Sequence, residues 1–257
     1  MSRNSSRASS RASSLNAPLD LLAIAAHPDD VELTCGGTVL KMSQAGYRTG
    51  ILDLTRGETG SRGTPETRLR EAEQAAKILG VKVRSNLGLP DARLAVTDEF
   101  KIAVAEAIRA LRPHTIILPY WEGRHPDHYN ASNLGFEGAF IAGLKAYPMK
   151  GEPFRPFKIL YATSDATARP TFAVDITQQY ESRRRAILAY KSQFTAPQKS
   201  PKSSKSKVYL PLDELEGRMS DQARHYGRMI GVKYAEGFVM KEVMRIDDVI
   251  TIPVRSI

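Results

Sequence analysis

Two short segments of this 257-residue chain combine histidine and aspartate in a spacing that suits metal-assisted chemistry. The segments read AHPDD and HPDH, and together they hold six candidate residues: His27, Asp29, Asp30, His125, Asp127 and His128. Two imidazoles and one carboxylate make a suitable shell for a catalytic zinc ion, with one position left open for water. A further carboxylate can take a proton from that water, and a further histidine can donate one to a leaving amine.

The assignment that we favour puts three of these residues on the metal: His27, Asp30 and His128. Asp29 then acts as the general base, and His125 stabilises the oxyanion or protonates the amine while Asp127 holds it. His-Pro-Asp is also an acceptable loop sequence, in which an aspartate can simply cap a helix. Spacing alone does not decide which residues bind a metal and which ones catalyse.

Both segments follow apolar stretches that predict buried strands, residues 19–26 (LDLLAIAA) and 114–120 (HTIILPY). Because the binding crevice of a parallel sheet lies beyond the carboxyl ends of its strands, the two segments should meet at one edge. Strands that alternate with helices over the first half of the chain indicate the doubly wound class. We therefore expect an α/β fold with a Rossmann-like, mostly parallel sheet, in a single domain with the active site at the C-terminal edge of the strands.

The remaining elements follow from periodicity and from the residues that start and stop helices. Further strands are expected at residues 47–55, 81–87, 159–163 and 171–176. Helices are expected at residues 36–46, 65–79, 98–111, 177–191 and 213–230. The signals around the second of these helices are the clearest: Thr64 suits an N-cap, Pro65 suits the first helical turn, and Gly80 suits the stop.

The net charge of +9 is concentrated outside the body of the chain. Residues 1–18 and 183–207 carry 11 of the 37 basic residues and no acid, which leaves 26 basic against 28 acidic residues elsewhere. We expect residues 1–18, rich in Ser and Arg, to be a disordered tail, 195–210 to be a flexible basic loop, and 19–257 to be the domain. Binding of nucleic acid through the basic stretches is the alternative from another functional class, and the balanced body argues against it.

No apolar run approaches the roughly 18 residues of a membrane-spanning helix, so no membrane partner is expected. Cys35 is the single cysteine, which excludes an intrachain disulfide and fits a reducing compartment, here the cytoplasm.

On these motifs the chain resembles the PIG-L/LmbE family of zinc-dependent N-deacetylases, whose signatures look like A-H-P-D-D and H-P-D-H. The resemblance covers about residues 19 to 245 and includes further segments that look like the bacillithiol-biosynthesis branch: 26–41, 53–72 (DLTRGETGSRGTPETRLREA), 86–94 (NLGLPDARL), 119–128, 189–194 and 231–238. It implies hydrolysis of N-acetylglucosaminyl-L-malate to acetate and a free amine. It also implies the same metal ligands, with Asp29 as the base and His125 as the acid or electrophile.

The resemblance implies two substrate-binding residues, Arg68 and Arg124, because a planar guanidinium can grip a malate carboxylate with two bonds. It further implies a homo-oligomer, often a hexamer in that branch, and a site loaded with Zn²⁺ or, in the cell, Fe²⁺. The chain departs from the branch between Phe194 and Pro211, where a lysine-rich insert replaces a Thr/Gly-rich loop. Deacetylation of another N-acyl sugar, or amidase action on a thiol conjugate, is the alternative within this chemistry.

Overall fold

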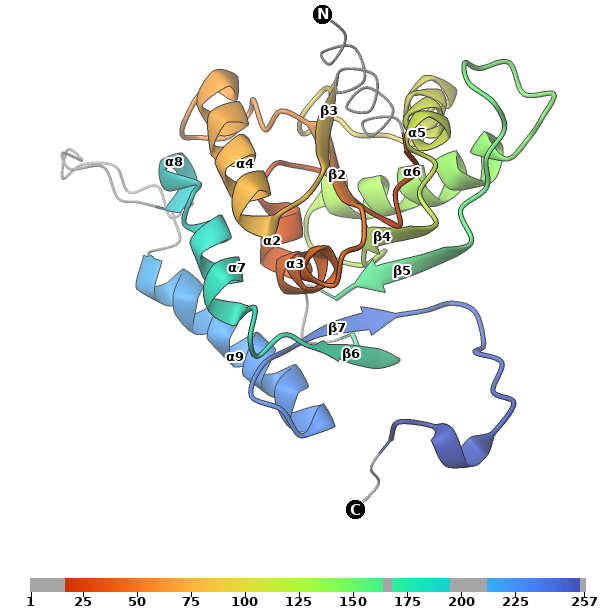
Figure 1. Cartoon of the computed structure of the whole chain (residues 1–257). Helices are drawn as coiled ribbons and strands as arrows, with labels where there is room; N and C mark the ends of the chain where they lie inside the picture. The colour runs from red at the N-terminus through yellow and green to blue at the C-terminus, as the bar shows by residue number, and fades with distance from the viewer. Residues whose placement is uncertain (1–16, 164–167, 195–211, 255–257) are drawn as a thin grey trace, which may run out of the picture.

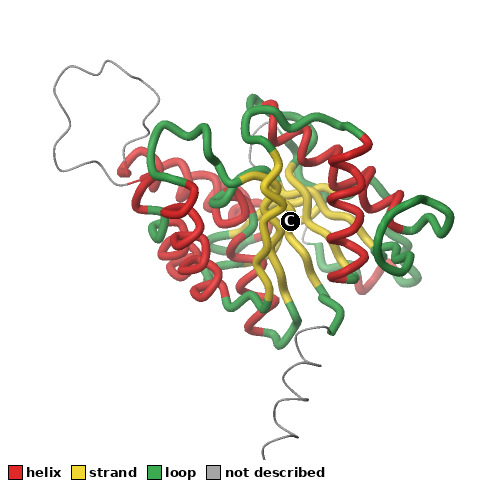
Figure 2. Tube along the Cα trace, turned by 90° about the horizontal axis from the view of Figure 1, so that it is seen from above, coloured by secondary structure: helices red, strands yellow, loops and turns green. Residues whose placement is uncertain are grey.

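A mixed sheet forms the centre of the fold in the computed structural model, which describes residues 17–163, 168–194 and 212–254. Its seven strands lie in the order β3 (Val83–Leu89), β2 (Thr49–Thr55), β1 (Leu21–Ala25), β4 (Thr115–Pro119), β5 (Lys158–Ala162), β7 (Ala235–Val239) and β6 (Phe172–Asp175). The first five are parallel, and β7 runs antiparallel to both of its neighbours. Helices cover both faces of the sheet (Figures 1 and 2). The expected single-domain α/β fold with a mostly parallel sheet is confirmed.

The two faces of the sheet are filled by alternate residues of the same strands. Leu22 and Ile24 of β1 pack with α5 (Asp98–Leu111) and α6 (Pro126–Ala142). Leu21 and Ala23 face the opposite side, where α3 (Gly36–Gln44), α4 (Pro65–Leu79) and α7 (Tyr180–Ile187) pack. Because every residue of β1 is buried, this strand reads as a continuous apolar run rather than an alternating one.

The order of the strands fixes where a ligand can bind. From β1 the chain winds outward through β2 to β3, and then returns to pair β4 with the other side of β1. The connections that follow β1 and β4 therefore diverge, and a crevice opens between them at the carboxyl ends of the strands. Both candidate segments lie in these connections.

Local signals set the boundaries of α4 and α5. The Thr64 hydroxyl accepts a hydrogen bond from the N–H of Thr67 at 3.2 Å, Pro65 opens α4, and Gly80 closes it with a positive φ of 67°. Thr97 caps α5 in the same way, so this helix spans the expected residues 98–111.

Four elements were not predicted: α2 (Asp30–Thr34), α6, β7 and the short 3₁₀ helix η1 (Val249–Thr251). α6 is apolar around most of its circumference and shows no helical stripe, and β7 is a short strand of mixed composition. The helix expected over 177–191 is divided into α7 and the short α8 (Lys191–Phe194), and α9 (Leu212–Ile230) covers the β6–β7 end of the sheet. Most of the predicted tail, residues 1–16, and the whole of the predicted basic loop, residues 195–210, lie outside the described residues. Among described helices, none is both long and apolar enough to cross a membrane.

Candidate metal centre

The two histidine- and aspartate-containing connections meet at the crevice between β1 and β4. The ring centres of His27 and His125 lie 5.0 Å apart, those of His125 and His128 lie 4.7 Å apart, and those of His27 and His128 lie 5.5 Å apart. The structure thus brings together all six residues that the sequence singles out, although they are separated by about a hundred positions along the chain.

Asp30 lies between two of the histidines. Its Oδ2 accepts a hydrogen bond from the backbone N–H of His27 at 2.9 Å and lies 3.2 Å from Nδ1 of that ring. Its Oδ1 lies 3.2 Å from Nε2 of His128. One ligand atom from each of these three residues falls within 4.8 Å of the others, a spacing that could hold a metal ion.

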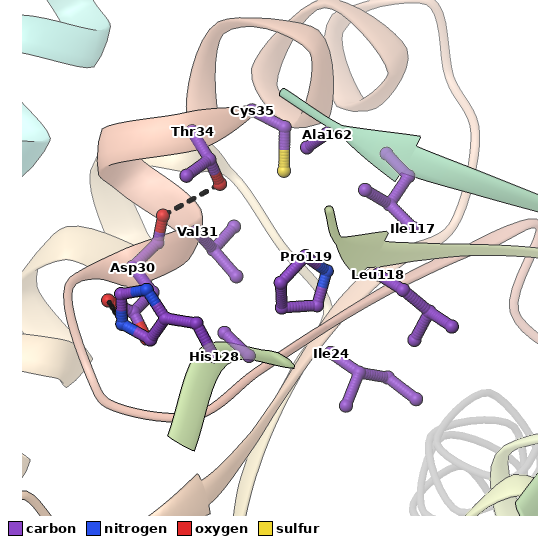
Figure 3. Close-up of a pocket in the computed structure, with 11 residues that line it drawn as sticks. Ile24, Asp30, Val31, Thr34, Cys35, Ile117, Leu118, Pro119, His128 and Ala162 are labelled. Carbon is purple, nitrogen blue, oxygen red and sulfur yellow. Dashed lines mark hydrogen bonds and ion pairs between the residues drawn. The ribbon is translucent and has the colours of Figure 1, made fainter. Parts of the chain in front are cut away.

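Asp30 and His128 stand beside each other at the rim of a small cavity of about 20 Å³ (Figure 3). Its wall includes Thr34, whose hydroxyl donates to the backbone carbonyl of Asp30 at 2.8 Å, and the buried thiol of Cys35. A volume of this size holds about one water molecule.

A second group with metal-ligand spacing contains His27, His125 and Asp127. Here the carboxylate of Asp127 is already engaged, because Oδ2 accepts from the N–H of Ala92 at 2.7 Å and Oδ1 accepts from the N–H of Leu94 at 3.2 Å. The first group, whose Asp30 oxygens face the two histidine rings, fits a metal ion better.

The role expected for the Asp127 carboxylate needs a correction. The sequence suggested that it holds His125, but its oxygens lie against the 92–94 backbone and 3.3 Å from Nε2 of His27. His125 instead caps α6, since its Nδ1 accepts from the backbone N–H of Asp127 at 3.2 Å. Asp127 therefore contacts His125 through its main-chain N–H, which donates to the ring, and not through its carboxylate.

Asp91 is a member of the site that sequence reasoning missed. Its Oδ1 lies 3.0 Å from Nε2 of His27, and its Oδ2 accepts from both the N–H and the hydroxyl of Thr59, at 2.8 and 2.7 Å. A carboxylate behind a histidine fixes the ring and its tautomer, a common arrangement around metal ligands. The signal was available, because Asp91 follows β3 as His27 follows β1, at the same edge of the sheet.

The carboxylates set the charge of the histidines. Burial would lower the pKa of His27, but Asp30 and Asp91 outweigh it and raise that pKa to about 11. Asp30 raises the pKa of His128, against the effect of burial. The two histidines in turn hold the pKa of Asp30 well below its usual range, although burial acts to raise it.

Asp29 occupies a strained position at the centre of the first motif. Its φ of 115° lies in the left-handed region, where residues other than glycine are uncommon and strain is often found at functional sites. Burial, together with the negative charge of Asp30, raises the pKa of Asp29 to about 7. Arg68 acts in the opposite direction, with Nη2 3.6 Å from Oδ2 of Asp29.

The two arginines have different surroundings. Arg68 is buried, its Nε has no hydrogen-bond partner among the described residues, and its guanidinium passes so close to Gly57 that a Cβ there would lie 2.1 Å from Nη1. Arg124 is exposed in the loop before α6, next to His125. Of these two arginines, only Arg68 is fixed by burial beside Asp29.

His125 is exposed and accessible to a ligand. Burial and the neighbouring charges of His128 and His27 lower its pKa. Because Nδ1 accepts a main-chain N–H, the neutral ring carries its proton on Nε2 and presents a hydrogen-bond donor to the crevice.

Comparison with known proteins identifies the family. Residues 22–138 match the PIG-L family model, described as GlcNAc-PI de-N-acetylase. The diacetylchitobiose deacetylase of Thermococcus kodakarensis is 32% identical in an alignment 233 residues long, and the match covers 84% of this chain and 81% of that protein. The chain belongs to the PIG-L family. This confirms the family expected from the two motifs, whereas the narrower bacillithiol branch is not established.

Two solved structures share the PIG-L fold. A conserved protein from Thermus thermophilus is 41% identical, with a TM-score of 0.80 over 89% of this chain and 98% of that one. The N,N'-diacetylchitobiose deacetylase from Pyrococcus horikoshii is 25% identical, with a TM-score of 0.72 and 92% of each chain covered. This PIG-L chain therefore matches these two relatives over nearly their whole length.

Proposed function

We propose that the protein is a metal-dependent N-deacetylase that hydrolyses the acetamide of an N-acetylglucosamine-containing substrate, releasing acetate and a free amine. The observation that carries this proposal is the convergence of Asp29, Asp30 and two histidines at the β1–β4 crevice of a PIG-L chain. Relatives named as deacetylases of acetylated sugars support the reaction class.

The donor set fits a divalent metal ion. His27 would bind through Nδ1 and His128 through Nε2, with Asp30 between them, while Asp91 and Asp127 hold the opposite nitrogen of His27. A metal bound there supplies Lewis acidity to the water and the carbonyl group that react. We propose Zn²⁺, with Fe²⁺ as the alternative, since nitrogen and carboxylate ligands accept both.

Asp29 is the proposed general base. Its pKa of about 7 suits a group that accepts a proton from the attacking water and later returns it to the departing amine. His125 donates from Nε2 to the carbonyl oxygen, where negative charge develops as the water adds. Because the ring is held neutral by its cap interaction, we assign it to this oxyanion rather than to protonation of the amine.

We propose two candidate substrates, one acidic and one uncharged. N-acetylglucosaminyl-L-malate, as in bacillithiol biosynthesis, is the acidic candidate, because Arg68 and Arg124 can bind a carboxylate. Diacetylchitobiose is the uncharged candidate, favoured by the 32% identical relative. Residues 19–257 are proposed as the catalytic domain of a cytoplasmic homo-oligomer.

Amine release from both candidates and from plain N-acetylglucosamine tests this function, with metal-loaded protein beside a chelator-treated sample. Asp29→Asn is the informative variant, because asparagine also tolerates a positive φ and keeps the shape of the side chain. We expect it to retain bound metal and lose turnover by at least about 100-fold, whereas His128→Ala loses both.

His114→Ala serves as the control, since this histidine is exposed at the opposite edge of the sheet and should leave turnover unchanged. Full activity in Asp29→Asn would refute the base assignment. Release that is indifferent to the chelator would refute the metal-dependent reaction. Faster turnover of the malate conjugate than of diacetylchitobiose would select the acidic substrate, and the reverse order would remove it.

A further inference from the structure

The loop between β4 and α6 is weakly held by its own main chain. Residues 121–124 form no hydrogen bond or ion pair with other described residues, and a Cβ on Gly123 would meet no atom within 4 Å. The ends of the loop are tied: the N–H of Tyr120 donates to a carbonyl of β5 at 3.1 Å, and His125 caps α6. We call residues 121–124 the β4–α6 loop. Arg124, one of the two arginines proposed to bind substrate, lies at its end.

A tryptophan side chain supplies the anchor that the main chain of this loop lacks. The ring centre of Trp121 lies 4.3 Å from that of Tyr120 and 4.8 Å from that of Tyr161. The second contact is edge to face, with 88° between the rings, which is a preferred geometry for aromatic pairs. Because Tyr161 is a buried residue of β5, Trp121 ties the β4–α6 loop to the core beside the sheet.

An ammonium group completes this anchor. Nζ of Lys241, which follows β7, lies near three ring centres: Trp121 at 4.6 Å, Tyr161 at 4.9 Å and Phe136 of α6 at 5.0 Å. A cation within about 6 Å of a ring centre is attracted to the ring. One ammonium therefore joins the β4–α6 loop, β5 and α6 to the end of β7. We call Lys241 and these three rings the aromatic clamp.

The ammonium of Lys241 is committed to the aromatic clamp. No carboxylate within residues 17–163, 168–194 and 212–254 forms an ion pair with it, although the residue is exposed. A surface lysine normally keeps its charged end in water while its stem packs on apolar atoms. An ammonium that lies against three rings is therefore a specific contact and not an ordinary exposed charge.

We propose that Lys241 is a positioning residue that holds the β4–α6 loop, and with it Arg124, beside the metal centre. His125 is held separately, by its cap interaction with α6. The aromatic clamp therefore acts on the binding of substrate and not on the step at the metal ion. Without the clamp, the apparent affinity falls with the fraction of time that the loop spends in its binding position. This effect on turnover rests on the proposed function, whereas the clamp itself does not.

Fluorescence tests the aromatic clamp without any turnover, because Trp121 is the only tryptophan of the chain. Lys241→Met keeps an unbranched side chain and removes its charge. We expect the quenching of Trp121 by acrylamide to rise at least about twofold in this variant, because the ring loses its cation and becomes more accessible. Lys241→Arg keeps a cation that stacks on aromatic rings, so it should restore the wild-type quenching.

The kinetics of amine release test the positioning role, with whichever of the three compounds named above the wild type turns over fastest. In Lys241→Met we expect KM to rise about 5–30-fold while kcat stays within about twofold, the range set by partly shielded cation–π contacts. Arg124→Ala should also raise KM. If Lys241 acts through Arg124, the double variant should be no worse than Arg124→Ala alone.

Lys233→Met is the matched control, because this ammonium lies 5.2 Å from the ring centre of Tyr234, far from Trp121 in the sequence. It should change neither the quenching nor KM.

Unchanged quenching in Lys241→Met, or an equal change in Lys233→Met, would overturn the aromatic clamp. Raised quenching with KM within about twofold of the wild type would overturn the positioning role, and so would a fall in kcat alone. Additive losses in the double variant would show that Lys241 does not act through Arg124, which also overturns it. A wild type that releases no amine from any compound would refute the proposed function instead, and the quenching would then decide for or against the clamp.

Discussion

Replacing Asp127 by asparagine tests our proposal that this residue positions His27 rather than His125. Asp127 is 1% exposed, and its Oδ2 lies 3.3 Å from Nε2 of His27 while also accepting the N–H of Ala92. Oδ1 accepts the N–H of Leu94. Asparagine keeps the shape of the side chain but removes its charge and one of its acceptors.

The substitution should weaken metal binding and lower the stability of the fold. Loss of a carboxylate behind a metal-binding histidine typically weakens metal affinity by about 10–100-fold, which is about 1.4–2.7 kcal/mol. Asp91, 3.0 Å from the same nitrogen, limits the loss to that range. One buried main-chain N–H also loses its acceptor, at about 1–3 kcal/mol of unfolding free energy. For a domain of this size that lowers the melting temperature by about 2–12 °C.

Calorimetric titration of chelator-treated protein with Zn²⁺ measures the affinity, and thermal melting measures the stability. Asp98→Asn is the control, because its side chain is 77% exposed and its ion pair is with Lys101. It should change neither quantity. A Zn²⁺ affinity of Asp127→Asn within about twofold of the wild type would refute the positioning role. Adding Asp91→Asn should deepen the loss beyond that of either single variant.

Three further outcomes are expected. Glu236→Gln should lower the free energy of unfolding, measured with denaturant, by about 3–5 kcal/mol. The reason is that the buried carboxylate accepts from two main-chain N–H groups and pairs with Arg183 at 3.1 Å. A loss below about 1 kcal/mol would contradict this. Arg68→Met should move the acid limb of the pH–rate profile to higher pH, since Arg68 lowers the pKa of Asp29, and an unmoved limb would count against Asp29 as the base. Metal binding should displace about one proton from His27, whose pKa is about 11 without metal, so affinity should rise with pH until the pH reaches about 11. Titration in buffers of different ionisation enthalpy would contradict this if no proton were released. The same raised pKa makes the stability of the metal-free fold depend on pH. Protonated His27 stabilises the fold fully below pH 6.5, and this contribution is lost as pH rises towards 11.

The parallel part of the fold could be predicted from the sequence, because local signals and hydrophobic periodicity agree there. The buried run of β1, the Thr64 cap and the Gly80 stop each specify their element within a few residues. α6 and β7 escaped prediction for a physical reason. α6 lacks an apolar stripe, and β7 is defined by pairing with β5 and β6, which are distant in the sequence.

The site was predictable as a set of residues but not as a set of contacts. The order of strands around β1 and β4 is enough to bring His27 and His128 together. The partners of His27 depend on the loop after β3, which places Asp91 and the 92–94 backbone against it. The direction of each side chain in the site follows from tertiary packing. The contact of the Asp127 carboxylate with His27, in place of His125, could therefore not be deduced from spacing.

We propose that one metal ion, held by His27, Asp30 and His128, is required for deacetylation. Titrating chelator-treated protein with Zn²⁺ while following amine release from an N-acetylglucosamine conjugate tests it most directly. We predict that activity rises in proportion to added metal and saturates at about one ion per chain, and that His128→Ala stays inactive over the same range. Undiminished activity in the metal-free protein, or saturation in His128→Ala at the wild-type rate, would refute the requirement for a metal ion at this site.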